Sequence, residues 1–174
     1  MRIHSASVLP FPRSLVYETY RDRLSAIAEE MTDIRKIDVL ARTDGTDGTT
    51  RIHNRWYAQV TLPSVAERVV KQEWRQWDDH AVWKDDAFVV DWRLEIPTFG
   101  DQVQCSGRNS FTAVEGGTQV ALEGDLQINI KKIPGVPSIL LRRALPEVEK
   151  FIARMIAPNL EKVNEGLQTV LERD

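Results

Sequence analysis

Three histidines, two pairs of adjacent aspartates and one cysteine are the side chains best suited to acid–base, metal or nucleophilic chemistry. They are His4, His53, His80, Asp78-Asp79, Asp85-Asp86 and Cys105. No spacing among them matches a metal site or a nucleophile beside its base, because the histidines are far apart and only one thiol is present. We therefore predict no catalytic residue, no metal site and no cofactor.

His80, in the stretch WDDHAVW, is the best single candidate for proton transfer, because neighbouring carboxylates could orient its imidazole. The plainer interpretation, which we favour, is a histidine in a turn or an edge strand. The pairs Asp78-Asp79 and Asp85-Asp86 are expected to be solvated turn residues, since aspartate commonly caps turns.

Three asparagines interrupt apolar patterns and are more informative. Asn54 lies between Ile52 and Trp56 in a strand-like alternation, Asn109 lies in a similar one, and Asn159 falls on the apolar face of the last helix. A buried amide without a partner costs on the order of 1–3 kcal/mol. Each should therefore bond to another side chain, to water or to the polar end of a ligand.

The elements that position these side chains follow from hydrophobic periodicity. Alternation predicts strands over residues 2–9, 34–43, 49–60, 77–83, 90–96, 103–112 and 119–130. Helices are predicted from Pro12, over 24–31, from Pro63 to Trp74, and from Pro146 to the end of the chain. The last three strands form a meander whose apolar face the long final helix must cover. Gly107 and Gly124 on that face predict curvature or a close approach.

The composition is that of one globular domain. The 174 residues carry a net charge of −3, with 42% hydrophobic residues, and the isoelectric point is near 5.7. An acidic chain argues against nucleic acid, whose phosphates attract a basic surface. The single cysteine, Cys105, excludes an internal disulfide, and in its apolar phase it is expected to be a small core residue. The chain shows no signal peptide and no apolar run of membrane-spanning length, so we expect a cytoplasmic protein.

The stretch KKIPGVPSILLRR, residues 131–143, places apolar residues between two basic pairs. Ser138 can cap a short turn carrying Ile139, Leu140 and Leu141 before Pro146 starts the helix again. One interpretation is transient contact with a membrane, the apolar side inserted and the basic side near anionic headgroups. We favour the other, in which the leucines pack on the sheet and the charges are solvated.

The order of strand, two short helices, antiparallel meander and long C-terminal helix resembles the START-like (SRPBCC) superfamily. The segments that carry the resemblance are SASVLPFPRSLVYETYRD, VVDWRLEI, VQCSGRNSFTAVEGGTQVALEGDLQINI and FIARMIAPNLEKVNEGLQTVL. Uncharacterised bacterial members are the most similar, and PRELI-type lipid-transfer domains more distantly so. The resemblance implies one α+β helix-grip domain over residues 1–174, with a curved antiparallel sheet wrapped around the C-terminal helix.

It also implies a cavity between sheet and helix for the binding or transport of a hydrophobic small molecule or lipid. The residues predicted to line it are Asn54, Trp56, Trp92, Leu94, Cys105, Asn109, Phe111, Leu122, Leu126, Phe151, Met155, Asn159 and Val163. Two alternatives remain open: an enzyme of the polyketide cyclase or dehydratase type, and a regulatory or dimerisation module whose cavity is filled. We expect binding rather than catalysis; the ligand and the oligomeric state do not follow from the sequence.

Overall fold

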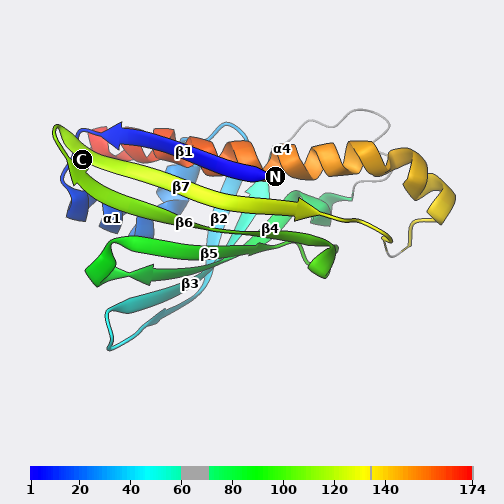
Figure 1. Ribbon diagram of the computed structural model, residues 1–174, viewed down its shortest axis with the longest axis horizontal. Helices are drawn as coiled ribbons and strands as arrows, with labels where there is room; N and C mark the ends of the chain where they lie inside the picture. Colours follow the sequence, from blue (N-terminus) through cyan, green and yellow to red (C-terminus); the bar gives the residue numbers. More distant parts are fainter. Residues whose placement is uncertain (60–70, 134, 174) are drawn as a thin grey trace.

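The computed structural model describes residues 1–59, 71–133 and 135–173, and in this part of the chain an antiparallel sheet faces one long helix (Figure 1). The strands are β1 (Arg2–Leu9), β2 (Ile34–Asp44), β3 (Thr49–Ala58), β4 (Gln76–Lys84), β5 (Val89–Glu95), β6 (Val103–Val114) and β7 (Gly117–Ile128). The α-helices are α1 (Arg13–Asp22), α2 (Leu24–Glu29) and α4 (Ser138–Arg173), with short 3₁₀ turns at Gln72–Arg75, Asp85–Ala87 and Gly100–Gln102.

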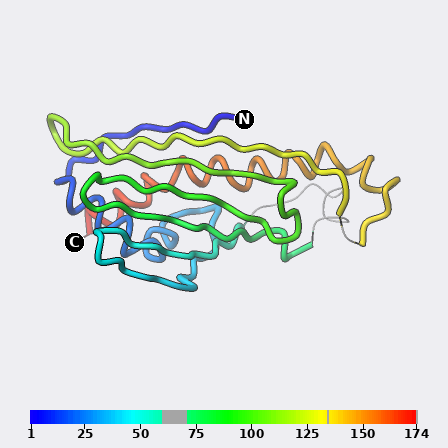
Figure 2. Tube along the Cα trace, turned by 60° about the horizontal axis from the view of Figure 1, so that its bottom comes forward, coloured from blue at the N-terminus to red at the C-terminus, as the bar shows by residue number. Residues whose placement is uncertain are grey.

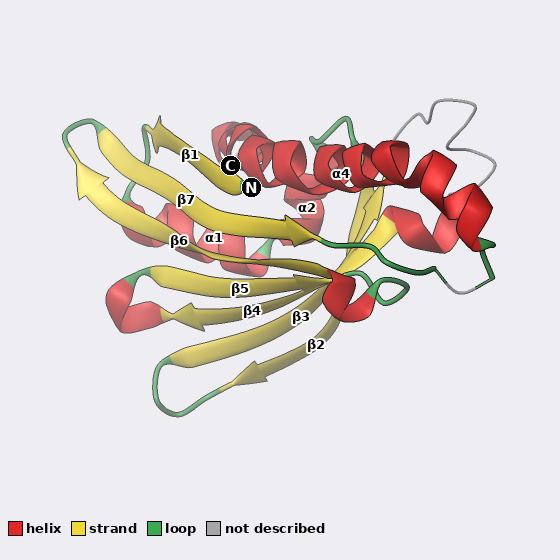
Figure 3. Ribbon diagram, turned by 45° about the vertical axis from the view of Figure 1, so that its right-hand side comes forward, coloured by secondary structure: helices red, strands yellow, loops and turns green. Residues whose placement is uncertain are grey.

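All seven strands form one sheet in the order β1-β7-β6-β5-β4-β3-β2, and every neighbouring pair is antiparallel. The first strand of the chain therefore lies beside the last, and the chain trace in Figure 2 shows the two running together. The strands curve away from α4 toward β2, and α1 and α2 pack between the sheet and α4 (Figure 3). This is the predicted α+β architecture, and the two short helices after the first strand are confirmed.

The period-two alternation correctly predicts which side chains point inward. Trp56 on β3, Trp92 on β5, and Leu122 and Leu126 on β7 are all buried on the face that α4 covers. Because successive strand residues point to opposite faces, this result fixes the register of all three strands. The weakly strand-like stretch at 77–83 is also confirmed, as part of β4.

The helix α4 buries one long apolar stripe against the sheet, α1 and α2. The prediction that the helix starts again at Pro146 is wrong, because α4 begins at Ser138 and continues through Pro146 and Pro158. Pro146 lies two turns into the helix, beyond the first turn whose N–H groups have no partner within the helix, so its missing N–H removes one backbone hydrogen bond that the helix tolerates. In the described part of the chain, no helix is long and apolar enough to cross a membrane.

Gly107 and Gly124 face each other on β6 and β7, and the indole of Trp92 lies over both. A Cβ added at Gly107 would lie 2.4 Å from Cζ2 of Trp92, and one at Gly124 would lie 2.6 Å from Cη2. Both distances are far below van der Waals contact. The absence of a side chain at both glycines therefore leaves room for the Trp92 indole to pack directly against the backbone of the sheet.

The predicted helix from Pro63 to Trp74 lies mostly outside the described residues. Its described end, Gln72–Arg75, is a 3₁₀ turn rather than an α-helix. The predicted strand over 49–60 ends at Ala58, and residue 60 is not among the described residues.

Candidate functional site

A small pocket, which we call the inner pocket, lies between the middle of the sheet and the helices. Its lining consists of Tyr20, Arg21, Leu24, Asn54, Trp56, Asp79, Ala81, Trp83, Val90, Trp92, Leu94, Asn109 and Leu160. Strands β3 to β6 supply the floor, α1 and the start of α2 supply one wall, and α4 contributes a leucine. Aromatic and aliphatic side chains dominate this lining, and a few polar groups converge within it, as is typical of ligand sites.

Asp79 supplies a carboxyl group to the inner pocket and is 7% exposed. Its Oδ2 accepts hydrogen bonds from Asn54 Nδ2 at 3.2 Å and from Trp56 Nε1 at 3.4 Å. Both donors are neutral, so burial dominates and raises the pKa of Asp79 to about 6. The Oδ1 atoms of Asp79 and Asn54 are buried without a hydrogen-bond partner. The pocket therefore contains two neighbouring side chains, each with an acceptor oxygen left unsatisfied.

A second polar group is built around Asn109. Its Oδ1 accepts a hydrogen bond from Trp92 Nε1 at 2.9 Å, and its Nδ2 donates to the hydroxyl oxygen of Tyr20 at 3.1 Å. Burial and the nearby charge of Asp79 raise the pKa of Tyr20 well above its usual value, so the phenol keeps its proton. In the described part of the chain no acceptor takes that proton, which leaves Tyr20 able to donate to a ligand.

The free volume of the inner pocket is about 30 Å³. This is about the share of volume that one water molecule occupies in the liquid. The lining side chains therefore fill almost all of the space between the sheet and the helices, and any larger occupant must displace some of them.

Comparison with known proteins finds relatives by structure only: no family model and no curated protein matches the chain. TTHA0849 from Thermus thermophilus is 21% identical with a TM-score of 0.65, over 97% of this chain and 95% of that one. The Zhui aromatase/cyclase from Streptomyces sp. R1128 is 16% identical with a TM-score of 0.65, over 99% and 94%. Ara h 8.0201 is 9% identical with a TM-score of 0.57, over 100% and 99%.

This chain has the START-like helix-grip fold. The resemblance inferred from its strand and helix order is thereby confirmed. Identities this low establish the fold, and one fold can support many activities. The chemistry of this chain must therefore be argued from its own side chains.

Of the thirteen residues predicted to line a cavity in the START-like domain, five line the inner pocket. These are Asn54, Trp56, Trp92, Leu94 and Asn109. The other eight are buried between sheet and helix but do not line it: Cys105, Phe111, Leu122, Leu126, Phe151, Met155, Asn159 and Val163. Among these eight, the amide of Asn159 donates to the backbone oxygen of Met155 at 2.8 Å. Contact between any of the thirteen and a ligand stays a prediction.

The sequence-based interpretation missed Asp79, the acidic residue of the lining. The prediction that Asp78 and Asp79 are solvated turn residues is wrong, because both lie within β4 and are buried. The sequence did contain a signal for an inward Asp79. In a strand it points to the same face as Trp77 and Trp83, which are also buried. A carboxylate in phase with two tryptophans was the pattern that indicated an inward acid.

The histidines lie on the other side of the sheet. His53 and His80 stack on the outer face with ring centroids 4.3 Å apart, and His53 Nε2 lies 3.2 Å from Asp78. Arg55 donates two hydrogen bonds to the same carboxylate. Burial works to raise the pKa of Asp78, but the bonds from Arg55 and His53 outweigh it and hold the pKa below its usual value. His80, the sequence's best candidate for proton transfer, is thus turned away from the inner pocket.

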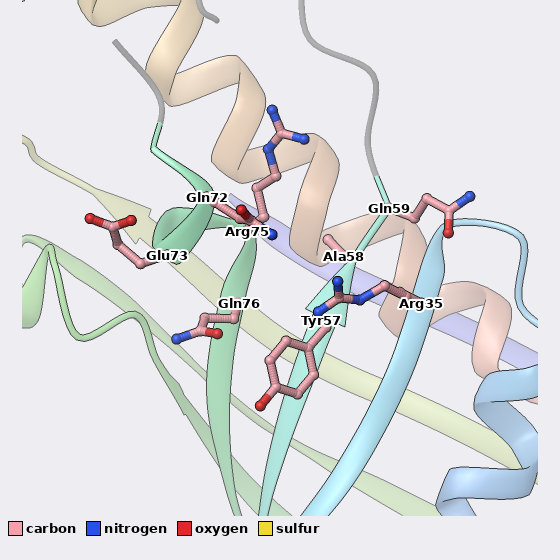
Figure 4. Close-up of a pocket in the computed structure, with 8 residues that line it drawn as sticks. All are labelled: Arg35, Tyr57, Ala58, Gln59, Gln72, Glu73, Arg75 and Gln76. Carbon is pink, nitrogen blue, oxygen red and sulfur yellow. The ribbon is translucent and has the colours of Figure 1, made fainter.

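A larger hollow, the outer pocket, opens near the ends of β3 and β4 (Figure 4). It has a volume of about 510 Å³ and is lined by Arg35, Tyr57, Ala58, Gln59, Gln72, Glu73, Arg75 and Gln76. The guanidinium of Arg35 lies 5.3 Å from the ring centre of Tyr57. Most of these side chains are polar or charged, so an apolar molecule would bury little apolar surface there. The inner pocket is the better candidate site for such a ligand.

Proposed function

We propose that this START-like domain binds a small, mostly apolar molecule whose hydroxyl group donates to Asp79 or Asn54, or whose amine group donates to both. The observation that supports this most directly is that Asp79 and Asn54, which both line the inner pocket, each have a buried acceptor oxygen without a partner, whereas Asn159 and Asn164, which have one too, do not line it. A buried polar atom left unsatisfied costs on the order of 1–3 kcal/mol, and such costs are usually tolerated where function requires the group. A ligand hydroxyl, with one hydrogen, would satisfy one of these oxygens, and an ammonium group could satisfy both.

The charge of the pocket favours the same kind of ligand. With a pKa of about 6, Asp79 is mostly ionised at neutral pH, and its described hydrogen-bond partners are the neutral groups of Asn54 and Trp56. The lining also includes Arg21, but its guanidinium is paired with Asp22 and Asp85. A ligand carboxylate or phosphate beside Asp79 would therefore be repelled, whereas a hydroxyl or an ammonium group would be attracted. The tryptophans of the lining offer flat apolar walls for the remainder of the molecule.

The size of the pocket sets a condition on binding. Pockets for small organic ligands usually measure about 300–1,000 Å³, so under this proposal the roughly 30 Å³ seen here must be a closed state that opens when a ligand binds. The strands are tied together by continuous ladders of backbone hydrogen bonds, whereas the helices are joined to the sheet by packing and by a few side-chain hydrogen bonds, such as those from Asn109 to Tyr20 and from Asn164 to Ser7. We infer that the helices, rather than the sheet, move outward, and that the energy of opening lowers the apparent affinity.

A comparison of 2-naphthol with 2-naphthoate tests this proposal. The expected result is that 2-naphthol quenches tryptophan fluorescence and raises the melting temperature, while 2-naphthoate does neither. Asp79→Asn should weaken 2-naphthol binding at least tenfold, and Asp78→Asn, a matched change on the outer face, should leave it unchanged. Equal binding of the two probes would contradict the proposed polarity. A pocket that takes neither, with no apolar molecule seen by native mass spectrometry, would favour a domain with a filled core.

The pKa of Asp79 favours one further candidate function, acid–base catalysis on the bound molecule. A carboxyl group with a pKa of about 6 exchanges protons readily near neutral pH, which a general acid or base must do. Tyr20, held by Asn109, is a donor within the same lining. If a substrate is found, the rate should depend on an ionisation near pH 6 that disappears in Asp79→Asn; a pH profile that survives this change would exclude the role.

A further inference from the structure

The first turns of α4 form one end of the molecule, beyond the ends of the strands (Figures 1 and 3). Leu141 is 5% exposed and anchors this end in the core, together with the buried Ile133. Ile139 and Leu140, next to it, are 69% and 44% exposed. The expectation that the leucines of this stretch pack inward is therefore confirmed for Leu141 and wrong for Leu140.

Four cations surround these exposed apolar side chains in the sequence. Lys131 and Lys132 precede them, Arg142 and Arg143 follow them, and all four are exposed. Within the described residues, no carboxylate forms an ion pair with any of the four. This end is therefore a locally basic patch on a chain whose net charge is −3.

A second exposed apolar pair on the same molecule provides a contrast. Val39 and Leu40, on the edge strand β2, are 53% and 45% exposed. The charges beside them are neutralised within the strand, because Lys36 pairs with Asp38 and Arg42 pairs with Asp44. Both places therefore expose two aliphatic side chains. The cations nearest Val39 and Leu40 are paired within β2, whereas the four cations at the end of α4 form no ion pair within the described residues.

We propose that the end of α4, defined by Lys131, Lys132, Ile139, Leu140, Arg142 and Arg143, docks on an anionic membrane surface. An aliphatic pair that enters the interface, with cations at the level of the lipid phosphates, is the combination that binds reversibly to such surfaces. The charge complementarity is specific to anionic lipid, since a neutral surface would leave the four cations without partners.

The docking surface is separate from the inner pocket, so this proposal does not depend on the proposed function. Leu160, the α4 residue in the pocket lining, lies twenty residues beyond Leu140, which is about 30 Å along a helix. Substitutions at the end of α4 are therefore expected to leave binding of a small apolar probe unchanged.

Co-sedimentation with vesicles tests the proposal on the full chain. We expect binding to vesicles of 30% phosphatidylglycerol in phosphatidylcholine, and at least tenfold weaker binding to phosphatidylcholine alone. Arg142→Ser with Arg143→Ser should weaken partitioning about thirty-fold, at about 1 kcal/mol per arginine near an anionic surface. Ile139→Ser with Leu140→Ser should weaken it at least tenfold, and the matched pair Val39→Ser with Leu40→Ser should not change it.

Three results would overturn the proposal. One is no sedimentation of the wild-type chain with anionic vesicles. Another is a loss of vesicle binding that is as large for Val39→Ser with Leu40→Ser as it is for Ile139→Ser with Leu140→Ser. The third is self-association, seen by analytical ultracentrifugation, that the Ile139→Ser and Leu140→Ser changes abolish while vesicle binding stays absent, because this would make the surface an interface between two copies. Melting curves of all variants should coincide with the wild type, since every altered side chain is exposed.

Discussion

Replacing Asp79 with asparagine should stabilise the fold at neutral pH, because burial of the ionised carboxylate is unfavourable. The pKa of this group rises from 3.8 to about 6 on folding. A folded-state pKa above the unfolded value means that the folded protein retains the proton longer. The contribution of this group to the free energy of unfolding is therefore fully present below about pH 3.8. It decreases as the pH rises to about 6 and is absent at higher pH. A difference of about two pKa units corresponds to about 3 kcal/mol.

Asparagine has nearly the shape of aspartate and can still accept the hydrogen bonds from Asn54 and Trp56. Its amide can also donate to the unpaired Oδ1 of Asn54. Urea unfolding at several pH values should show Asp79→Asn more stable than the wild type by about 3 kcal/mol at pH 7.5 and by almost nothing at pH 3.5. In a thermal scan at pH 7.5 the gain corresponds to about 6–12 °C, at 2–4 °C per kcal/mol for a chain of this size.

Asp78→Asn is the internal control, because the pKa of this neighbouring carboxylate is lowered in the folded protein, whereas that of Asp79 is raised. The ion pairs of Asp78 therefore stabilise the fold above the unfolded pKa, and that stability is lost as the pH falls. The variant should therefore be less stable than the wild type at pH 7.5. A loss of stability in Asp79→Asn that is the same at every pH would refute the assignment of Asp79 as a strained buried acid.

Three smaller predictions concern the packing. Gly124→Ala should lower the free energy of unfolding in urea by about 1–3 kcal/mol, because its Cβ would press on Trp92. An unchanged urea midpoint would contradict the close packing of Trp92 on Gly124. Leu141→Asp should lower the free energy of unfolding by about 3 kcal/mol or more, whereas Leu140→Asp should change it by no more than about 0.5 kcal/mol; similar melting curves for the two would show that the assigned burial is wrong. Burial raises the pKa of Cys105 to about 12, so its thiol should react with a disulfide reagent at pH 8 only in urea, and rapid labelling of the folded chain would exclude this environment.

The sheet and its inward face could be predicted because alternation is a strong local signal. Trp92 and Leu122 each lie on the apolar side of a clear alternation of apolar and polar residues, so their burial could be predicted from that alternation alone. Asp79 was not found because a pair of adjacent aspartates usually marks a turn, and the weak strand pattern around it did not outweigh that preference. The pairing of β4 between β3 and β5 shows that the stretch is a strand, and in a strand the phase shared with Trp77 and Trp83 places this carboxylate inside.

The pocket's extent could not be predicted for a different reason. Phe151 and Met155 have the apolar spacing of a lining residue, and they are buried, but whether a buried side chain borders an open space depends on packing across the whole domain. Likewise, a helix that starts at Ser138 must include Pro146, and the burial of Leu141 in the core helps to offset the cost of that proline.

The pairing of β1 with β7 has a consequence for how the chain folds as it is made. Arg2 lies opposite Asp125 and Leu9 opposite Thr118, so the first strand leaves the ribosome long before its partner exists. Contacts between residues so distant in sequence make folding slow, since a long loop must close before they form. Until β7 and α4 emerge, the growing sheet carries unpaired strand edges and an uncovered apolar face, which are the features that chaperones protect. Synthesis of the last helix is therefore the step that ends the chain's exposure to aggregation.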